Sequence, residues 1–269
     1  MSLIKDRAAG VLIGLAAGDT IGGPVRMAHL LAQRLLAQQA FNADDVRQQY
    51  LTWWRDDGFD TGPTAAHVFE LIEGGMSPEG AVRQVHEWHN RLTAGCNPAH
   101  RAPVMAAAAF LPDETLFRHA ADEAALTHYD PLAGEVSAAV VMLCRALIRG
   151  VEWDDACKAV AGKLPPRTAD LLTTRTTVEK LHAGGYAPHV LQGAVHFVGK
   201  YDSFIAALRM SVRLAGWGNY VPVLVGAIGG ARWGMSSIPG AEVLNSLDIL
   251  PDLHATAGQL AAGWDTIGG

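Results

Sequence analysis

The fold is decided by the stretch Ala8-Ala9-Gly10-Val11-Leu12-Ile13-Gly14-Leu15-Ala16-Ala17-Gly18-Asp19. Two basic residues, Lys5 and Arg7, precede this apolar run, as they would in a secretory leader. The run is short, however, and Asp19 follows it directly. Its three glycines recur every four residues, so they share one helix face and let another backbone approach closely. The stretch therefore predicts a buried structural helix that ends at Gly18, and not a targeting peptide.

The composition is that of a globular protein with ample material for a core. The chain has 269 residues, a formal net charge of -6, 49% hydrophobic residues and 18% charged residues. This length suits one domain over residues 1–269. The 21 Lys and Arg residues are spread along the chain, so we expect no nucleic-acid surface. The apolar runs are too short to span a bilayer, so we also expect no membrane partner.

The three cysteines are the next constraint. Cys96, Cys144 and Cys157 cannot all pair with one another, and they lack a C-x-x-C spacing. This pattern predicts neither a disulfide scaffold nor a zinc–cysteine site. It favours a reducing compartment, and we expect a cytoplasmic protein.

The rest of the chain reads as one helix after another. In the segment 132–147 the apolar residues recur at intervals of three and four, which is the helical period. Proline stands where a first helical turn accepts it at Pro63, Pro78 and Pro166. No segment alternates apolar and polar residues for long enough to predict a strand. We therefore predict an all-α protein of about a dozen helices, given the usual helix length.

Two helix starts have the same design and could form a site. Asp60 and Thr61 stand just before the helix expected from Pro63, and Asn219 stands just before the helix expected from Pro222. Helix N-termini offer unpaired N–H donors and the positive end of a dipole. The simpler interpretation is that these residues only cap their helices. The alternative is that both starts converge on one cleft, which spacing alone does not decide.

Two further clusters carry hydrogen-bonding side chains. The loop expected over residues 97–103 holds Asn97 and Arg101, whose planar fork suits a phosphate or carboxylate. The segment 127–131 holds His128, a candidate for acid–base chemistry or ligand binding, and Asp130. The alternatives are a surface loop with a capping Asn, and an Asp130 cap with Pro131 at the first helical position. A functional role for His128 and an Asp130 cap are compatible.

Taken in order, these clusters resemble the ADP-ribosylglycohydrolase family over nearly the whole chain. The carriers of the resemblance are the opening Gly10-x-x-x-Gly14-Leu15-Ala16-x-Gly18-Asp19-x-x-Gly22-x-Pro24, the segment 97–103, Thr127-His128 with Pro131, and the glycine-rich segment 226–234 followed by Ile238-Pro239. Each motif alone is weak, but four in order are specific. The resemblance implies a compact orthogonal helix bundle that hydrolyses ADP-ribosyl bonds with a two-magnesium centre.

The sequence departs from the family at the metal positions. Usual members carry Thr-Asp-Asp-Thr where this chain has Gly58-Phe59-Asp60-Thr61, and Asp-x-Asp-Thr where it has Trp217-Gly218-Asn219-Tyr220. Magnesium prefers carboxylate and water oxygens, and few carboxylates remain. We therefore expect no firm cofactor and no complete two-magnesium centre. Any magnesium that bound would use Asp60, Thr61 and Asn219.

We accordingly predict a hydrolase that cleaves an ADP-ribosyl or related ribosyl glycosidic bond of a small-molecule nucleotide or ADP-ribosyl substrate. The bond breaks through an oxocarbenium-like state, which a carboxylate stabilises. The predicted catalytic residues are Asp60, His128 and Asp130, and the predicted substrate-binding residues are Asp19, Thr61, Asn97, Arg101, Asn219 and Tyr220. The alternative is an inactive pseudo-enzyme that binds a nucleotide or ADP-ribose, and a purely structural helical domain ranks third. The sequence leaves the oligomeric state open.

Overall fold

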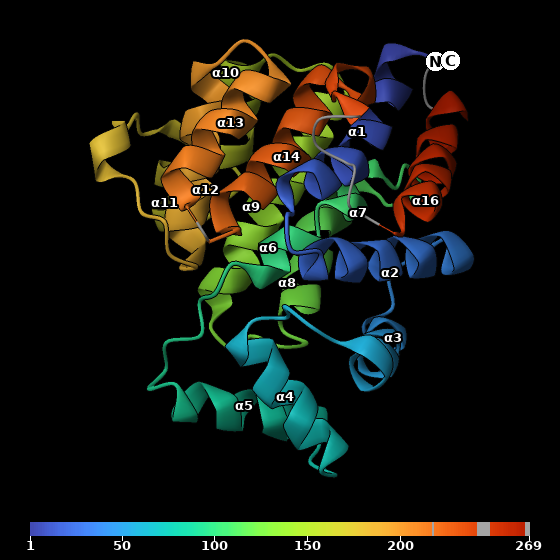
Figure 1. The fold of residues 1–269 in the computed structure, drawn as a ribbon, viewed down its shortest axis with the longest axis vertical. Coiled ribbons are helices and arrows are strands. Elements are labelled where there is room, and N and C mark those ends of the chain that lie inside the picture. Colours follow the sequence, from blue (N-terminus) through green and yellow to red (C-terminus); the bar gives the residue numbers. More distant parts are fainter. Residues whose placement is uncertain (217, 241–247, 267–269) are drawn as a thin grey trace.

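The computed structural model describes residues 1–216, 218–240 and 248–266, and within these ranges it contains helices and no β-strand. The prediction of an all-α fold is therefore confirmed. The longer helices are α1 (Leu3–Gly18), α2 (Gly23–Gln38), α3 (Ala43–Asp57), α4 (Pro63–Glu73), α5 (Pro78–Trp88), α8 (Leu116–Ala124), α9 (Pro131–Ile148), α10 (Trp153–Ala161), α11 (Pro166–Thr173), α12 (Ala187–Lys200), α13 (Phe204–Ala215), α14 (Tyr220–Trp233) and α16 (Leu250–Ala262). The described residues also form two short helices, α6 (Asn97–Arg101) and α7 (Val104–Ala107), and four 3₁₀ turns (Figure 1).

The tightest packing joins α1 to α14. Gly10 lies against Gly230, Gly14 against Gly226, and Gly18 against Pro222, so the two helices run antiparallel with their glycine faces in contact. Figure 1 shows the two helices side by side at the centre of the bundle. A β-carbon built on Gly226 would lie 2.8 Å from the carbonyl carbon of Gly14, which leaves room for backbone only. The buried helix predicted from the glycine spacing is confirmed.

Helix α9 is the other central element. It contacts α1, α6, α7, α8, α10, α11, α12 and α14. By length and composition alone its segment Pro131–Ile148 could cross a membrane, and 72% of that segment is buried inside the structure. In this fold α9 is thus a core helix, whose apolar side chains are covered by its neighbours.

The helix starts predicted from proline are confirmed at α4, α5 and α11. At α9 the Asp130 carboxylate accepts a hydrogen bond from the Leu132 N–H at 2.9 Å, so the predicted cap is also confirmed. The expectation of a loop over residues 97–103 is wrong, because most of this segment forms α6 and is buried. Proline at the second position of α6 starts a helical turn, and the surrounding helices cover it.

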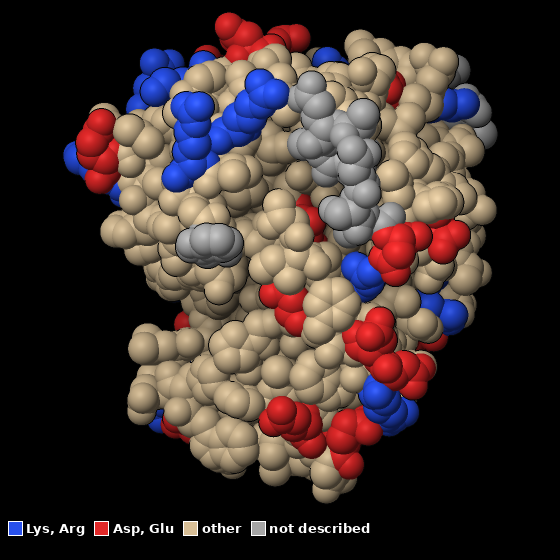
Figure 2. Space-filling view, in the orientation of Figure 1, with Lys and Arg blue, Asp and Glu red and all other residues tan. Residues whose placement is uncertain are grey.

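Helices α4 and α5 pack mainly against each other and form a lobe at the bottom of Figure 1. The lobe has its own small core, made of Val68, Ala81, Val82 and Val85. Figure 2 shows a hollow at the left, between this lobe and the rest of the molecule. The lobe begins directly after Asp60 and Thr61 and ends before Asn97, so both of its connections carry residues predicted for the site.

The α1–α14 contact predicts a large effect of a single methyl group. Gly226→Ala should destabilise the protein by about 3 kcal/mol or more, because two backbones must separate to admit the methyl group. Gly258→Ala in α16 is the matched control, since a β-carbon there meets nothing within 4 Å among the described residues. The control should be neutral or stabilising by about 0.5–1 kcal/mol. Urea unfolding checks both, and equal stabilities of the two variants would contradict the packing argument.

Candidate active site

Asp19, at the end of α1, ties down the start of α2. Its carboxylate accepts hydrogen bonds from the N–H groups of Gly22 at 2.9 Å and Val25 at 2.8 Å, and a longer one from Ile21. The side chain is buried. Burial raises the pKa of Asp19, while the hydrogen bonds oppose that rise. A carboxylate at a helix N-terminus is a stabilising arrangement, so Asp19 stabilises the start of α2, and its predicted substrate contact stays a prediction.

Asn219 connects the start of α14 to Asp19 and therefore to the start of α2. Its amide nitrogen donates to Asp19 Oδ1 at 2.5 Å, and its amide oxygen accepts from the backbone N–H and the hydroxyl of Thr20, both at 3.2 Å. The simpler interpretation, in which Asn219 only caps α14, is therefore wrong. The side chain crosses from one helix start to another, because α1 and α14 are antiparallel neighbours. Trp217, in the same family position, lies outside the described residues.

Asp60 is the third side chain at the point where Asp19, Asn219 and the start of α2 meet, which we call the meeting point. The N–H of Gly23, at the start of α2, donates to its carboxylate. Gly62 occupies the N-cap position of α4, so the interpretation of Asp60 or Thr61 as a simple cap is wrong. Asp60 has a positive φ of 51°, a left-handed conformation that Asp and Asn tolerate better than most residues and that is often found at functional sites.

The Asp60 carboxylate is electrostatically strained. Burial raises its pKa to about 6, and the charge of Asp19 adds to the rise, while the hydrogen bond from Gly23 opposes it. Its Oδ2 atom is buried and has no hydrogen-bond partner among the described residues. A carboxylate with a pKa near neutrality and a spare oxygen is suited to exchanging a proton.

Thr61, in the turn before α4, and Asn97, the first residue of α6, lie next to each other. The Asn97 amide nitrogen donates to the Thr61 carbonyl oxygen at 3.0 Å, and the Thr61 side chain is buried. The Asn97 side chain also lies against Gly62, where a β-carbon would approach it to 2.9 Å. Gly62 has a positive φ of 77°. Asn97 therefore holds the Asp60–Gly62 turn in place and leaves its carbonyl oxygen for other contacts.

Arg101 lies in a buried network behind the site. Its side chain is 1% exposed, forms an ion pair with Glu123, and donates to the Thr127 hydroxyl at 2.8 Å. Tyr50 donates to Glu123 at 2.9 Å. Burial raises the pKa of Glu123, and the charge of Arg101 opposes that rise. Arg101 thus holds this network together, and the substrate contact predicted for it stays a prediction.

The same network orients His128. Thr127 Oγ1 accepts from Arg101 and lies 2.8 Å from His128 Nδ1. Because the Thr127 hydroxyl already accepts from Arg101, we assign its proton to the contact with Nδ1 and the imidazole proton to Nε2. Burial lowers the pKa of His128 well below its ordinary value, and the charge of Arg101 acts in the same direction. His128 is thus a neutral hydrogen-bond donor, and this geometry favours ligand contact over the predicted transfer of a proton.

His128 Nε2 faces Gly95, just before α6. His128 Nε2 has no hydrogen-bond partner among the described residues, and it lies 2.9 Å from the position of a β-carbon on Gly95. Glycine at position 95 therefore keeps the space in front of the imidazole open. Asp130, two residues further on, caps α9 through the Leu132 N–H, and its catalytic role stays a prediction, since a cap and a functional role are compatible.

Tyr220, the first residue of α14, is 37% exposed. Its ring packs against Gly185, and its carbonyl oxygen accepts from His100 Nε2 at 2.9 Å. Burial lowers the pKa of His100 to about 4. Sequence reasoning did not select His100, Glu123 or Tyr50. Their partners lie far along the chain, so no local pattern could have revealed them.

The donor set does not fit a two-magnesium centre. The Asn219 amide and the Asp19 carboxylate are bonded to each other and to backbone N–H groups, so neither presents free oxygens as a hard cation requires. Within the described ranges, no three His, Cys, Asp or Glu side chains are grouped as metal ligands. Asp60 Oδ2 is the one carboxylate oxygen in the cluster of Asp19, Asp60 and Asn219 that keeps no described partner.

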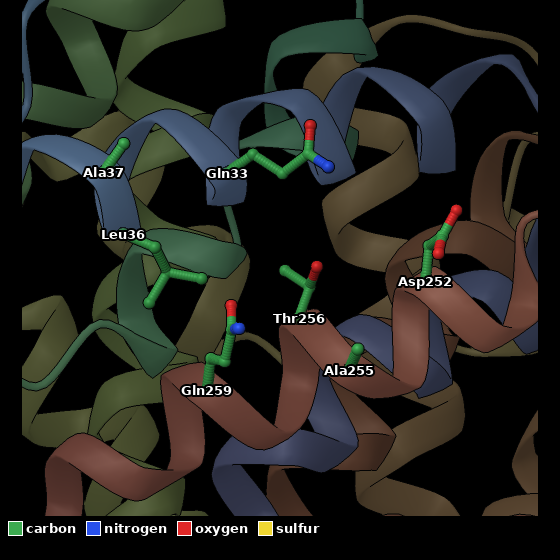
Figure 3. A pocket seen from close by; sticks show the side chains of 7 residues that line it. All are labelled: Gln33, Leu36, Ala37, Asp252, Ala255, Thr256 and Gln259. Atoms are coloured by element: carbon green, nitrogen blue, oxygen red, sulfur yellow. The ribbon is translucent and has the colours of Figure 1, made fainter.

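The larger of the two described cavities lies away from these residues. It has a volume of about 450 Å³ and opens between α2 and α16 (Figure 3). Its lining consists of Gln33, Leu36, Ala37, Asp252, Ala255, Thr256 and Gln259. None of the predicted site residues belongs to this lining, and it offers a shallow polar surface without a catalytic constellation.

The strained carboxylate predicts an unusual pH dependence of stability. Because the pKa of folded Asp60 is raised to about 6, its stabilising contribution is present below the unfolded pKa and lost as the pH rises through 6. Asp60→Asn should therefore stabilise the protein by about 1 kcal/mol at pH 8, after allowance for solvent screening, and by much less at pH 4. Thermal melts at both pH values measure this gain. Asp57→Asn, at an exposed carboxylate, is the control, and a pH-independent effect of Asp60→Asn would contradict the argument.

Comparisons with known proteins agree with this architecture. The ADP-ribosylglycohydrolase family model matches residues 25–267. An ADP-ribosyl-[dinitrogen reductase] glycohydrolase from Rhodospirillum rubrum is 22% identical over 91% of this chain and 92% of its own length. A solved structure, titled an ADP-ribosylglycohydrolase-related protein complex, has a TM-score of 0.79 and 23% identity over 98% of this chain and 99% of that chain. The chain therefore belongs to the ADP-ribosylglycohydrolase family.

Proposed function

We propose that this chain hydrolyses an ADP-ribosyl or related ribosyl glycosidic bond without a complete two-magnesium centre. The observation that carries the proposal is Asp60: a carboxylate with a pKa near 6 and a buried free oxygen, at the meeting point of α2 and α14 in a member of this family. The relative from Rhodospirillum rubrum is, by its name, a glycohydrolase of an ADP-ribosyl group on dinitrogen reductase, which supports the same reaction class.

In the proposed reaction Asp60 acts on the sugar and on the attacking water. Its negative charge stabilises the positive charge that develops on the ribose as the glycosidic bond breaks. The oxygen of water bonds to the anomeric carbon, the water proton passes to the carboxylate, and the leaving group departs with the electron pair of the broken bond. His128 Nε2–H and Tyr220 would contact the nucleotide, and Asn97 would keep the Asp60 turn in position.

The second candidate is a binding protein that has lost the chemistry. The pairing of Asn219 with Asp19 favours it, because a donor stands where usual family members place a metal-ligating carboxylate. In this case the pocket would bind a nucleotide or ADP-ribose and release it unchanged.

Release of ADP-ribose from a panel of ADP-ribosylated peptides and nucleotides separates the two candidates. We expect turnover that persists in EDTA, and a loss of about 100-fold or more in Asp60→Asn, because the charge disappears at nearly constant shape. Asp57→Asn should keep full turnover. Tight binding of ADP-ribose without turnover would instead establish the pseudo-enzyme, and turnover that requires magnesium would contradict the metal-poor site.

A stability measurement tests the metal argument without any activity. Asn219→Asp replaces a donor by a second carboxylate beside Asp19, which should destabilise the protein by about 2 kcal/mol at pH 8. Millimolar magnesium should restore the melting temperature of this variant and leave that of the parent unchanged. Asn42→Asp is the control, because Asn42 caps α3 through its side-chain oxygen and Asp caps equally well. A strong response of the parent protein to magnesium would overturn the argument.

A further inference from the structure

A second cavity lies at the other ends of α1 and α14. Its volume is about 210 Å³, and its lining consists of Arg7, Leu147, Val151, Glu152, Trp153, Arg232 and Trp233. Arg7 belongs to the first half of α1 and Arg232 to the last turn of α14. Because the two helices are antiparallel, this cavity is separated from Asp19 and Asn219 by most of their length. It is therefore not part of the candidate active site.

Two arginines are held in place around this cavity. Arg7 Nη1 donates to the carbonyl oxygen of Leu147 at 3.2 Å, near the end of α9. Arg232 Nη1 donates to the carbonyl oxygen of Val198, near the end of α12. The guanidinium carbon of Arg232 lies 5.3 Å from the ring centre of Trp153 and 4.8 Å from that of Trp233. Both side chains are thus oriented before any ligand arrives, which lowers the entropic cost of binding.

The charge of these arginines is incompletely balanced. Within the described residues, neither Arg7 nor Arg232 has a carboxylate oxygen within the 4.0 Å of an ion pair, and Arg7 Nε is buried without a hydrogen-bond partner. Burial lowers the pKa of Arg232, and the charges of Asp202, Glu152 and Asp154 oppose that fall. Of these carboxylates only Glu152 lines the cavity; it is exposed to solvent, so solvent reduces its repulsion of a bound anion without abolishing it.

We propose that this cavity is a binding site for a small oxyanion, a phosphate or a carboxylate, held between Arg7 and Arg232. Guanidinium forks bind these groups with paired, charge-assisted hydrogen bonds. The volume suits a small anion and is below that of a typical nucleotide or drug pocket. The competing carboxylate of Glu152 makes the expected affinity weak, in the millimolar range. The proposal is independent of the function proposed for Asp60.

Titration of the full chain with inorganic phosphate, and separately with succinate, tests the proposal at constant ionic strength. Trp153 and Trp233 line the cavity, so binding should change tryptophan fluorescence and raise the melting temperature saturably. Whichever anion responds more strongly identifies the preferred group. Arg7→Gln should weaken the affinity about tenfold, whereas Arg213→Gln, at an exposed arginine of α13, should leave it unchanged.

Glu152→Gln makes the test robust against a folding defect in the arginine variants. Removal of the competing carboxylate should strengthen phosphate or succinate binding by about threefold or more, and the exposed position should tolerate the change. A parent protein that responds to neither anion would overturn the proposal. So would a response that is equal in the parent, Arg7→Gln and Glu152→Gln proteins, since that would be a general salt effect.

Discussion

The structure depends on the backbone contact between α1 and α14. Three positions of α1 carry glycine where α14 approaches, and two of the three positions facing them are glycine as well. Because both helices are buried, their sequences lack the polar face that orients a surface helix. Steric fit between small residues then determines the register. The antiparallel arrangement brings the end of α1 to the start of α14, and this is why Asp19 meets Asn219.

At that meeting point and in the buried network behind it, hydrogen-bond donors of the protein itself satisfy buried carboxylates. Asp19 is satisfied by the N–H groups at the start of α2 and by the amide of Asn219, and Glu123 by Arg101 and Tyr50. Buried charges need such partners, because desolvation is costly. Asp60 differs, since its second oxygen has no described partner and its pKa is raised. The unbalanced carboxylate is therefore the position at which chemistry or ligand binding is expected.

Family membership supports the architecture of this protein, whereas the chemistry of its site depends on individual side chains. The family match spans residues 25–267, and the architecture follows from packing that the chain retains. The resemblance implies metal ligands at the positions where this chain has Asn219 and Tyr220, and the Asn219 side chain is bonded to Asp19. A fold can keep its shape while its site changes, since packing and chemistry depend on different residues. The glycines between α1 and α14 are residues of the packing, whereas Asn219 is a residue of the site.

The sequence alone was sufficient to predict the helical class and the glycine face of α1. It also predicted the starts of α4, α5, α9 and α11. These features arise within one or two helical turns, so local spacing, proline and capping side chains are sufficient to predict them. The contacts between distant segments required the tertiary structure. Arg101 pairs with Glu123, and Asn219 reaches Asp19. Asp60, in a left-handed turn before α4, lies close to the start of α2. The charge state and exposure of a side chain depend on neighbours that are distant in sequence. An Asp shortly before a proline that starts a helix can therefore end as a cap, as for Asp130, or as a carboxylate with a raised pKa, as for Asp60.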